Sequence, residues 1–262
     1  MADILETIAE SNREIVRQRK EVKPLNAVMD EAFARGKGSF SFEKALAKEG
    51  LSFICECKKA SPSKGIISED FPYIDIAKDY EKAGADCISV LTEPVWFKGS
   101  TDILTQIASS VKTPCLRKDF TIDEYMIYEA VTCGASAVLL ICSILDSKTL
   151  GKYIRLCDEL GLSALVEAHD SNEVEMGLGE GARIIGVNNR NLRDFTVDPT
   201  NCLRLREIVG DRALFVAESG VKTHEDVVKL EKEMCDAVLI GESMMRSEDK
   251  VAFLKELRYG ND

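Results

Sequence analysis

The sequence has only two histidines, no CxxC pair and no cluster of cysteines and histidines at the spacing of a zinc site. Its nine cysteines stand in apolar segments, which is typical of reduced, buried thiols. We therefore expect neither a bound metal nor a disulfide framework.

Long hydrophobic runs are also missing. The longest apolar stretch, Ala135–Ile141, contains Ser136 and is far shorter than the ~20 residues that cross a bilayer. Residues Met1–Lys20 mix charged and apolar side chains, so they lack the apolar core of a secretory signal. These absences predict a cytoplasmic protein that does not enter a membrane.

Positive charge is scarce, because 34 lysines and arginines stand against 45 aspartates and glutamates, for a net charge of -11. This balance argues against a nucleic-acid partner, which needs a basic stripe, and against an anionic membrane surface. A few cations in one cleft still suffice to bind an anionic small molecule. The acidic surface favours a monomer, while the helix faces leave a dimer open.

The first fifty residues contain no strand candidate. Apolar residues recur at helical spacing over Asp3–Lys20, and helical patterns follow over Pro24–Arg35 and Ser41–Glu49. We expect residues 1–50 to form a helical extension that packs on the remainder, residues 51–262, as part of a single domain.

From Leu51 onward, short apolar runs alternate with helical patterns such as Tyr73–Ala83, Asp123–Thr132 and Ser147–Leu160. The runs lack strict polar alternation, as expected for strands buried on both faces of a parallel sheet. They are Ser52–Cys57, Asp86–Leu91, Pro114–Arg117, Ala135–Leu140, Ser163–Val166, Ile184–Val187, Ala213–Ala217 and Ala237–Ile240. This repeated α/β alternation predicts a closed (β/α)8 barrel, the TIM-barrel fold.

Ionisable side chains follow most of these runs, at the end where enzymes of this fold carry their catalytic groups. Side chains alternate along a strand, so an inward Lys58 would turn Cys55 and Cys57 toward the helices. The same count gives one inward set: Glu56, Lys58, Lys118, Glu167, Asn188 and Glu218. Confined lysines and glutamates shift each other's pKa and supply an acid and a base, although any single one also fits a structural ion pair.

Small residues follow the last two runs, where this fold commonly binds phosphate. Ser219-Gly220 and Gly241-Glu242-Ser243 allow backbone N–H groups to approach an anion. Ser61-Pro62-Ser63-Lys64-Gly65 adds hydroxyls and a cation, and Arg190 offers a bidentate contact. We predict an anionic, phosphate-bearing small molecule at this edge.

The two histidines and the loop aromatics have simpler interpretations. We expect surface or capping roles for His169 and His224. Trp96, Phe97 and Phe195 lie in loops that leave the second and sixth strands, where they either complete the core or stack on a planar substrate.

Seven motifs resemble those of the indole-3-glycerol-phosphate synthase family of tryptophan biosynthesis, in that family's order and spacing. They are Phe53–Ser63, Leu91–Glu93, Leu116–Phe120, Leu165–Glu167, Gly186–Leu192, Ala217–Gly220 and Ile240–Met245. The helical extension is similar as well. Each motif alone says little, but the whole set over roughly Leu51–Arg246 is highly specific.

The resemblance implies a carboxy-lyase that closes the indole ring of 1-(2-carboxyphenylamino)-1-deoxyribulose 5-phosphate, with loss of carbon dioxide and water. It implies Lys118 as the general acid and Glu167 as the general base. Lys58 matches the second essential lysine, near the substrate carboxylate and the leaving hydroxyl. Glu56 matches the glutamate that orients the lysines and the substrate.

The remaining matched positions divide by role. Asn188 and Glu218 match further polar groups of the family's active site. The family's phosphate-binding loops match Ser61, Arg190, Ser219, Gly220, Gly241, Glu242 and Ser243. Phe97, Leu139 and Phe195 match positions that hold the anthranilate ring. No cofactor is implied, because regained aromaticity drives the decarboxylation.

Three other interpretations fit parts of the pattern. A Schiff-base aldolase would use Lys118 as its nucleophile. Phosphoribosylanthranilate isomerase shares the fold and neighbouring chemistry, but the two-lysine, three-glutamate set favours the synthase. A non-catalytic barrel that only binds a phosphometabolite would suit a chain without Lys118 or Glu167.

Overall fold

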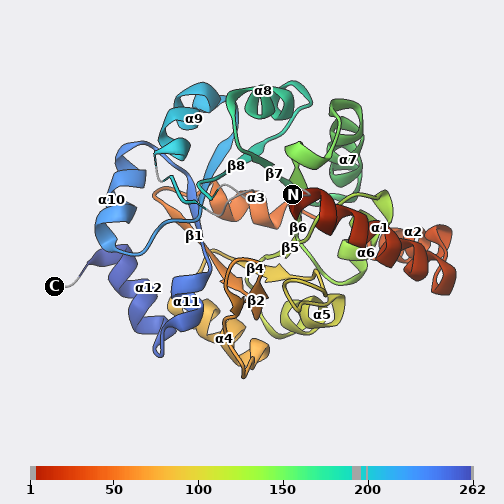
Figure 1. Cartoon of the computed structure of the whole chain (residues 1–262), viewed down its shortest axis with the longest axis horizontal. Helices are drawn as coiled ribbons and strands as arrows, with labels where there is room; N and C mark the ends of the chain where they lie inside the picture. Colours follow the sequence, from red (N-terminus) through yellow and green to blue (C-terminus); the bar gives the residue numbers. More distant parts are fainter. Residues whose placement is uncertain (1–3, 191–195, 199, 261–262) are drawn as a thin grey trace.

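A computed structural model describes residues 4–190, 196–198 and 200–260 of the chain. Eight parallel strands form a closed barrel, in which each strand pairs with its neighbour along the chain and the last pairs with the first (Figure 1). The strands are β1 (Ser52–Cys57), β4 (Cys87–Leu91), β5 (Cys115–Lys118), β6 (Ala137–Ile141), β7 (Ser163–Ala168), β8 (Ile184–Asn188), β9 (Leu214–Glu218) and β10 (Ala237–Ile240). The predicted TIM barrel is therefore confirmed.

A ring of helices surrounds the strands (Figure 1). The helices are α4 (Tyr73–Ala83), α5 (Thr101–Ser110), α6 (Glu124–Thr132), α7 (Ser147–Leu160), α8 (Ser171–Gly179), α9 (Asn201–Val209), α10 (His224–Lys232), α11 (Glu242–Arg246) and α12 (Lys250–Tyr259). Two short 3-10 turns lie in the connections: η1 (Cys142–Ile144) between β6 and α7, and η2 (Gly210–Arg212) between α9 and β9. Asp123, Asp146 and Asp170 begin α6, α7 and α8 by accepting a backbone N–H bond from the first turn.

Three helices precede the barrel: α1 (Ile4–Val22), α2 (Leu25–Ala34) and α3 (Ser41–Leu46). The third is shorter than predicted, since it ends at Leu46 rather than at Glu49. Helix α3 packs Phe42 and Leu46 into the apolar interior of the barrel, and its Glu43 N–H donates to Ser163 at the start of β7. Helix α1 contributes Leu5 and Ile8 to the same interior cluster.

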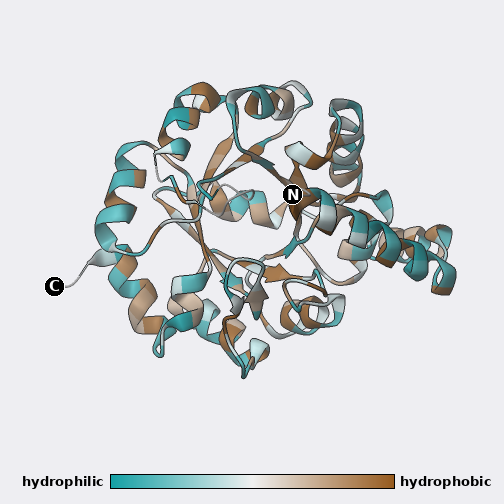
Figure 2. Cartoon of the chain, viewed as in Figure 1, coloured by the Kyte–Doolittle hydropathy of each residue, from teal (hydrophilic) through white to brown (hydrophobic). Residues whose placement is uncertain are grey.

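Strand side chains divide between two apolar layers, as alternation along each strand predicts. Ile54 faces the barrel interior, whereas Cys55 and Cys57 belong to the outer layer that packs against the helices. Both layers are apolar, which explains the largely unbroken apolar runs in the sequence. Figure 2 shows the strands predominantly brown, while the helices mix brown and teal.

The loop between β1 and α4 contains structure that the sequence did not predict. Ala60–Ser61 (β2) and Gly65–Ile66 (β3) pair as a two-residue antiparallel hairpin. Strands this short bury too few side chains to leave a periodic signal. The hairpin fixes the Ser61 loop beside the first strand end.

A glycine contact joins the N-terminal segment to the barrel. Gly161 ends α7 in the left-handed region, at φ +66°. Its carbonyl accepts the Phe40 N–H at 3.1 Å, and the Gly38 N–H donates to the Leu160 carbonyl at 2.8 Å. A side chain on Gly161 would meet the backbone of Gly38, so both the conformation and the contact require glycine.

We expect Gly161→Ala to lower the free energy of unfolding by more than Gly84→Ala. Gly84 ends α4 in the same left-handed region, at φ +86°, but a Cβ there meets no atom within 4 Å. Both variants lose the ~1–2 kcal/mol that a left-handed non-glycine residue costs, and only Gly161→Ala adds the clash. Urea unfolding measures both losses, and equal losses would contradict this account.

Candidate active site

Five strands bring the predicted polar side chains together at the mouth of the barrel. The Lys118 Nζ donates to Glu167 Oε2 at 3.1 Å and to Glu218 Oε2 at 2.8 Å. The Lys58 Nζ donates to Glu56 Oε1 at 2.5 Å. The Lys118 contacts join β5, β7 and β9, whereas the Lys58 contact lies at the end of β1. The side chains of Glu167 and Glu218 are each only 2% exposed. Lysines and glutamates thus lie together in a confined space, as the alternation of side chains along the strands predicted.

The charges in this cluster set each other's protonation. Although burial opposes it, Glu218 and Glu167 raise the pKa of Lys118 above its ordinary value. Burial, with the negative charge of Glu167, raises the pKa of Glu218 to about 7 despite the nearby lysine. Against burial, Lys118 and His169 hold the pKa of Glu167 below its ordinary value. At neutral pH the cluster therefore holds an ammonium, a carboxylate, and a second carboxyl close to its midpoint.

An inward glycine makes room for the second carboxyl. A Cβ on Gly186 of β8 would meet Glu218 Oε1, and it would lie 3.1 Å from Leu165. Gly186 lies two residues before Asn188 on β8, so the two residues share the inward face of the strand. That spacing is the signal in the sequence that would have identified Gly186. Asn188 itself orients the rim, because its Oδ1 accepts from the Ser219 hydroxyl and the Arg190 N–H, both at 3.0 Å.

Behind Lys118 lies a buried ionic network that the sequence reasoning missed. Arg117 points to the outer face of β5 with no exposed surface and pairs with Glu129 at 2.8 Å and Asp119 at 3.3 Å. Asp119 also accepts from Asn12 of α1 at 2.8 Å, and Glu129 pairs with Arg19 at 2.8 Å. Arg117 and Asp119 lie in the Leu116–Phe120 motif, so the signal was present but only Lys118 was assigned.

Apolar side chains line the mouth beside the ionic cluster. Leu139 is 3% exposed on β6, and Phe97 and Trp96 pack against the same interior apolar layer. The Phe97 ring lies 6.2 Å from the Phe120 ring in a tilted arrangement. Phe120 was not predicted, although it belongs to a recognised motif. Phe195 lies outside the described residues.

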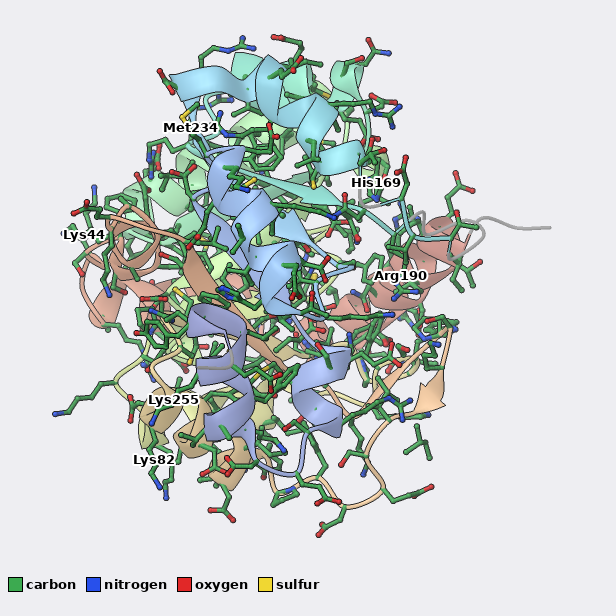
Figure 3. All side chains as sticks on the ribbon, turned by 90° about the vertical axis from the view of Figure 1, so that its left-hand side faces the viewer. Lys44, Lys82, His169, Arg190, Met234 and Lys255 are labelled. Carbon is green, nitrogen blue, oxygen red and sulfur yellow. The ribbon has the colours of Figure 1, made fainter. Side chains whose placement is uncertain are left out.

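The predicted phosphate loops lie at the ends of β1, β8, β9 and β10. Ser219 and Gly220 adopt left-handed backbone conformations, at φ +68° and +95°. Gly241 packs close to the carboxylate of Glu56 and the ammonium of Lys58, so a side chain there would collide with both. Figure 3 shows Arg190 at the same end of the molecule as His169, away from Lys44 and Lys82.

The remaining phosphate candidates belong to two short elements. Ser61 lies in β2 with its hydroxyl 3.5 Å from that of Ser63. Glu242 and Ser243 are the first residues of α11, whose five residues were predicted only as a loop. The Glu242 carboxylate pairs with Arg246 at 3.2 Å and lies 4.0 Å from Lys64, so the loops after β1 and β10 meet.

A metal site and a membrane-spanning helix are both absent from the described part of the chain. Within residues 4–190, 196–198 and 200–260, no three histidine, cysteine, aspartate or glutamate side chains are arranged to hold a metal ion. No helix in that part of the chain combines the length and apolar character needed to span a membrane.

Comparisons with known proteins agree over nearly the whole chain. The family profile described as "Indole-3-glycerol phosphate synthase" matches residues 5–257. Curated proteins of that name include one from Ruminiclostridium cellulolyticum, 55% identical over 97% of this chain and 98% of its own length. Another, from Endomicrobium trichonymphae, is 50% identical over 97% of this chain and 99% of its own length.

A solved structure supports the fold alone. A 3-hexulose-6-phosphate synthase superimposes with a TM-score of 0.65, covering 81% of this chain and 100% of that one. The two sequences are 15% identical.

We expect the free energy of unfolding to fall with rising pH between about 5 and 8, because folding raises the pKa of Glu218. The folded carboxyl binds its proton more tightly than the unfolded one, so its stabilising contribution is complete below the unfolded pKa of about 4.3. That contribution is lost as the pH passes about 7. One such group gives a slope of up to ~1.4 kcal/mol per pH unit.

Glu218→Gln removes this titration and keeps the shape of the side chain, so its slope is expected to be flatter. His169, whose pKa is also raised, contributes a slope of the same sign and stays in both proteins. Urea unfolding at several pH values gives the comparison. Identical slopes for the two proteins would show that Glu218 does not titrate in this range.

Proposed function

Because the chain belongs to the indole-3-glycerol phosphate synthase family of carboxy-lyases, we propose that its mouth cluster carries out the ring closure of that family, in tryptophan biosynthesis. The substrate is 1-(2-carboxyphenylamino)-1-deoxyribulose 5-phosphate. The observation that carries the proposal is the Lys118 ammonium, held between Glu167 and Glu218 inside the barrel.

Ring closure needs an acid at the ketone. The aromatic carbon that bears the carboxylate attacks the ketone carbon, and the displaced electron pair moves onto the ketone oxygen. Lys118 donates a proton to that oxygen, because its glutamate partners raise its pKa and keep it charged at neutral pH. Loss of carbon dioxide then returns the bonding pair to the ring and restores its aromaticity.

Dehydration needs an acid and a base together. The new hydroxyl leaves as water from one carbon, while the neighbouring carbon loses a proton. Glu167 is the base, since the pKa of its carboxyl is held low and its Oε1 has no hydrogen-bond partner among the described residues. Lys58, oriented by Glu56 at 2.5 Å, assists the leaving hydroxyl and faces the substrate carboxylate.

Binding groups flank this chemistry on two sides. The phosphate is assigned to Ser61, Arg190, Ser219, Gly220, Gly241, Glu242 and Ser243. Glu242 contributes its backbone N–H, since its carboxylate would repel the phosphate. The planar ring is assigned to Phe97, Leu139 and Phe195. The left-handed backbone at Ser219 and Gly220 supports the phosphate assignment, because such turns direct successive N–H groups toward an anion.

The Schiff-base alternative conflicts with the charge state of Lys118. An imine forms from a neutral amine, whereas Glu218 and Glu167 raise the pKa of this lysine despite its burial. Reduction with borohydride in the presence of substrate distinguishes the two chemistries. A substrate trapped on Lys118 would favour the aldolase.

We expect the protein to convert the carboxyphenylamino-deoxyribulose phosphate into a product with indole fluorescence. Lys118→Ala is expected to lower kcat by roughly 10²–10⁴-fold, the usual contribution of a positioned acid. Lys255→Ala, at the opposite end of the barrel (Figure 3), is the matched control and is expected to keep the wild-type rate.

Circular dichroism and the unfolding midpoint show whether Lys118→Ala remains folded. A folded wild-type protein that forms no indole would refute the proposed function. A folded Lys118→Ala variant with a near-wild-type rate would refute only the role of Lys118.

A further inference from the structure

His169 lies at the rim of the mouth, two residues after the proposed base Glu167. Its Nε2 is 3.6 Å from Glu167 Oε1, and its Nδ1 is 3.3 Å from Glu173 Oε2. Both His169 Nε2 and Glu167 Oε1 are buried, and neither has a hydrogen-bond partner among the residues that the structure describes. Two unsatisfied polar atoms thus face each other at a distance that a small movement closes.

The loop that carries His169 is anchored on both neighbouring helices. Its backbone N–H donates to Glu173 Oε2 at 2.7 Å, and its carbonyl accepts from Asn201 Nδ2, at the start of α9, at 3.2 Å. The N-cap of α8 is Asp170, whose side chain accepts the Glu173 N–H, so the His169 side chain does not cap this helix. The ring does something else, because it reaches from Glu173 toward Glu167.

Three acidic groups act on the charge of the ring. They are Glu167 on β7, Glu173 on α8 and, further away, Glu218 on β9. Although burial opposes it, Glu173 and Glu167 raise the pKa of His169 above its ordinary value. The ring is therefore well suited to carry a proton near neutral pH.

The proposed reaction, on which this inference rests, consumes protons. The substrate carboxylate leaves as neutral carbon dioxide and the hydroxyl leaves as water. Substrate and one proton therefore give indole-glycerol phosphate, carbon dioxide and water. Since the side chains of Glu167 and Glu218 are 2% exposed, the cluster needs a connection to solvent that delivers one proton per turnover.

We propose that His169 is a positioning residue that acts through Glu167. In this role His169 carries protons between the solvent and the Glu167 carboxyl. The His169 side chain is 22% exposed, against 2% for Glu167.

After decarboxylation, Lys118 is a neutral amine and Glu167 is still a carboxylate. The imidazolium then gives its Nε2 proton to Glu167 Oε1, which leaves a neutral ring and a neutral carboxyl. Rotation of the carboxyl group turns this proton toward the Lys118 amine, which lies 3.1 Å from Glu167 Oε2, and its transfer restores the ammonium and the carboxylate. The ring then regains a proton from water at the rim. In the dehydration that follows, the proton that Glu167 takes from carbon balances the proton that leaves with the hydroxyl as water.

The test compares the two histidines of the chain. His169→Asn is expected to lower kcat by roughly 10-fold or more, less than the loss of a direct acid or base, with KM within about 2-fold of wild type. Added imidazole is expected to restore much of the lost rate, because it replaces the missing ring. His224→Asn is the control, since the His224 Nδ1 contacts the Leu257 carbonyl of α12, at 2.9 Å, away from the mouth cluster.

Two results would overturn the inference: a His169→Asn variant with wild-type kcat, or a reduced kcat that imidazole does not restore. If His169→Asn does not fold, ¹⁵N-histidine NMR of Glu167→Gln replaces it. The pKa of His169 is then expected to fall, and an unchanged His169 would overturn the inference. A wild-type protein without indole product would instead defeat the proposed function, so the two failures are distinguishable.

Discussion

The ammonium of Lys118 is shared by two carboxylates inside an apolar barrel, and much of the mouth is built around that interaction. Removing one partner of a buried ion pair typically costs about 3–5 kcal/mol, so the three groups have to stay together. Strands β5, β7 and β9 must therefore bring Lys118, Glu167 and Glu218 to the same level along the barrel axis. Gly186 must leave space for Glu218. Burial and the charge of Glu167 raise the pKa of Glu218, while Lys118 holds the pKa of Glu167 low against burial, so the two carboxyl groups titrate apart within the same small volume.

The opposite face of β5 explains how the N-terminal helices belong to this site. Arg117, adjacent to Lys118, is held by Glu129 and Asp119, and these two carboxylates also bind Arg19 and Asn12 of α1. Helix α1 is thus tied to the strand that carries the proposed acid. Its apolar residues Leu5 and Ile8 join the barrel interior, so docking of this helix and the position of β5 depend on the same contacts.

The alternation of side chains along each strand made it possible to predict from sequence which polar residues point into the barrel. A period of two residues decides which side chains share a face, so Glu56, Lys58, Lys118, Glu167, Asn188 and Glu218 followed from eight apolar runs. Contacts between distant elements did not follow, because Asn12 meets Asp119 across 107 positions and the approach of His169 to Glu167 depends on a loop. The name of the substrate came from the family resemblance, since charge and periodicity describe only an anion-binding mouth.

The protonation state of Lys118 is the most direct measure of this account. Heteronuclear NMR of ¹⁵N-lysine-labelled protein, assigned with Lys118→Ala, follows the Nζ group as the pH rises. The account predicts that Lys118 remains an ammonium beyond the ordinary lysine midpoint of about 10.4. A midpoint near neutral pH would contradict it, because the residue would then be a free amine suited to imine formation rather than a charged acid between two carboxylates.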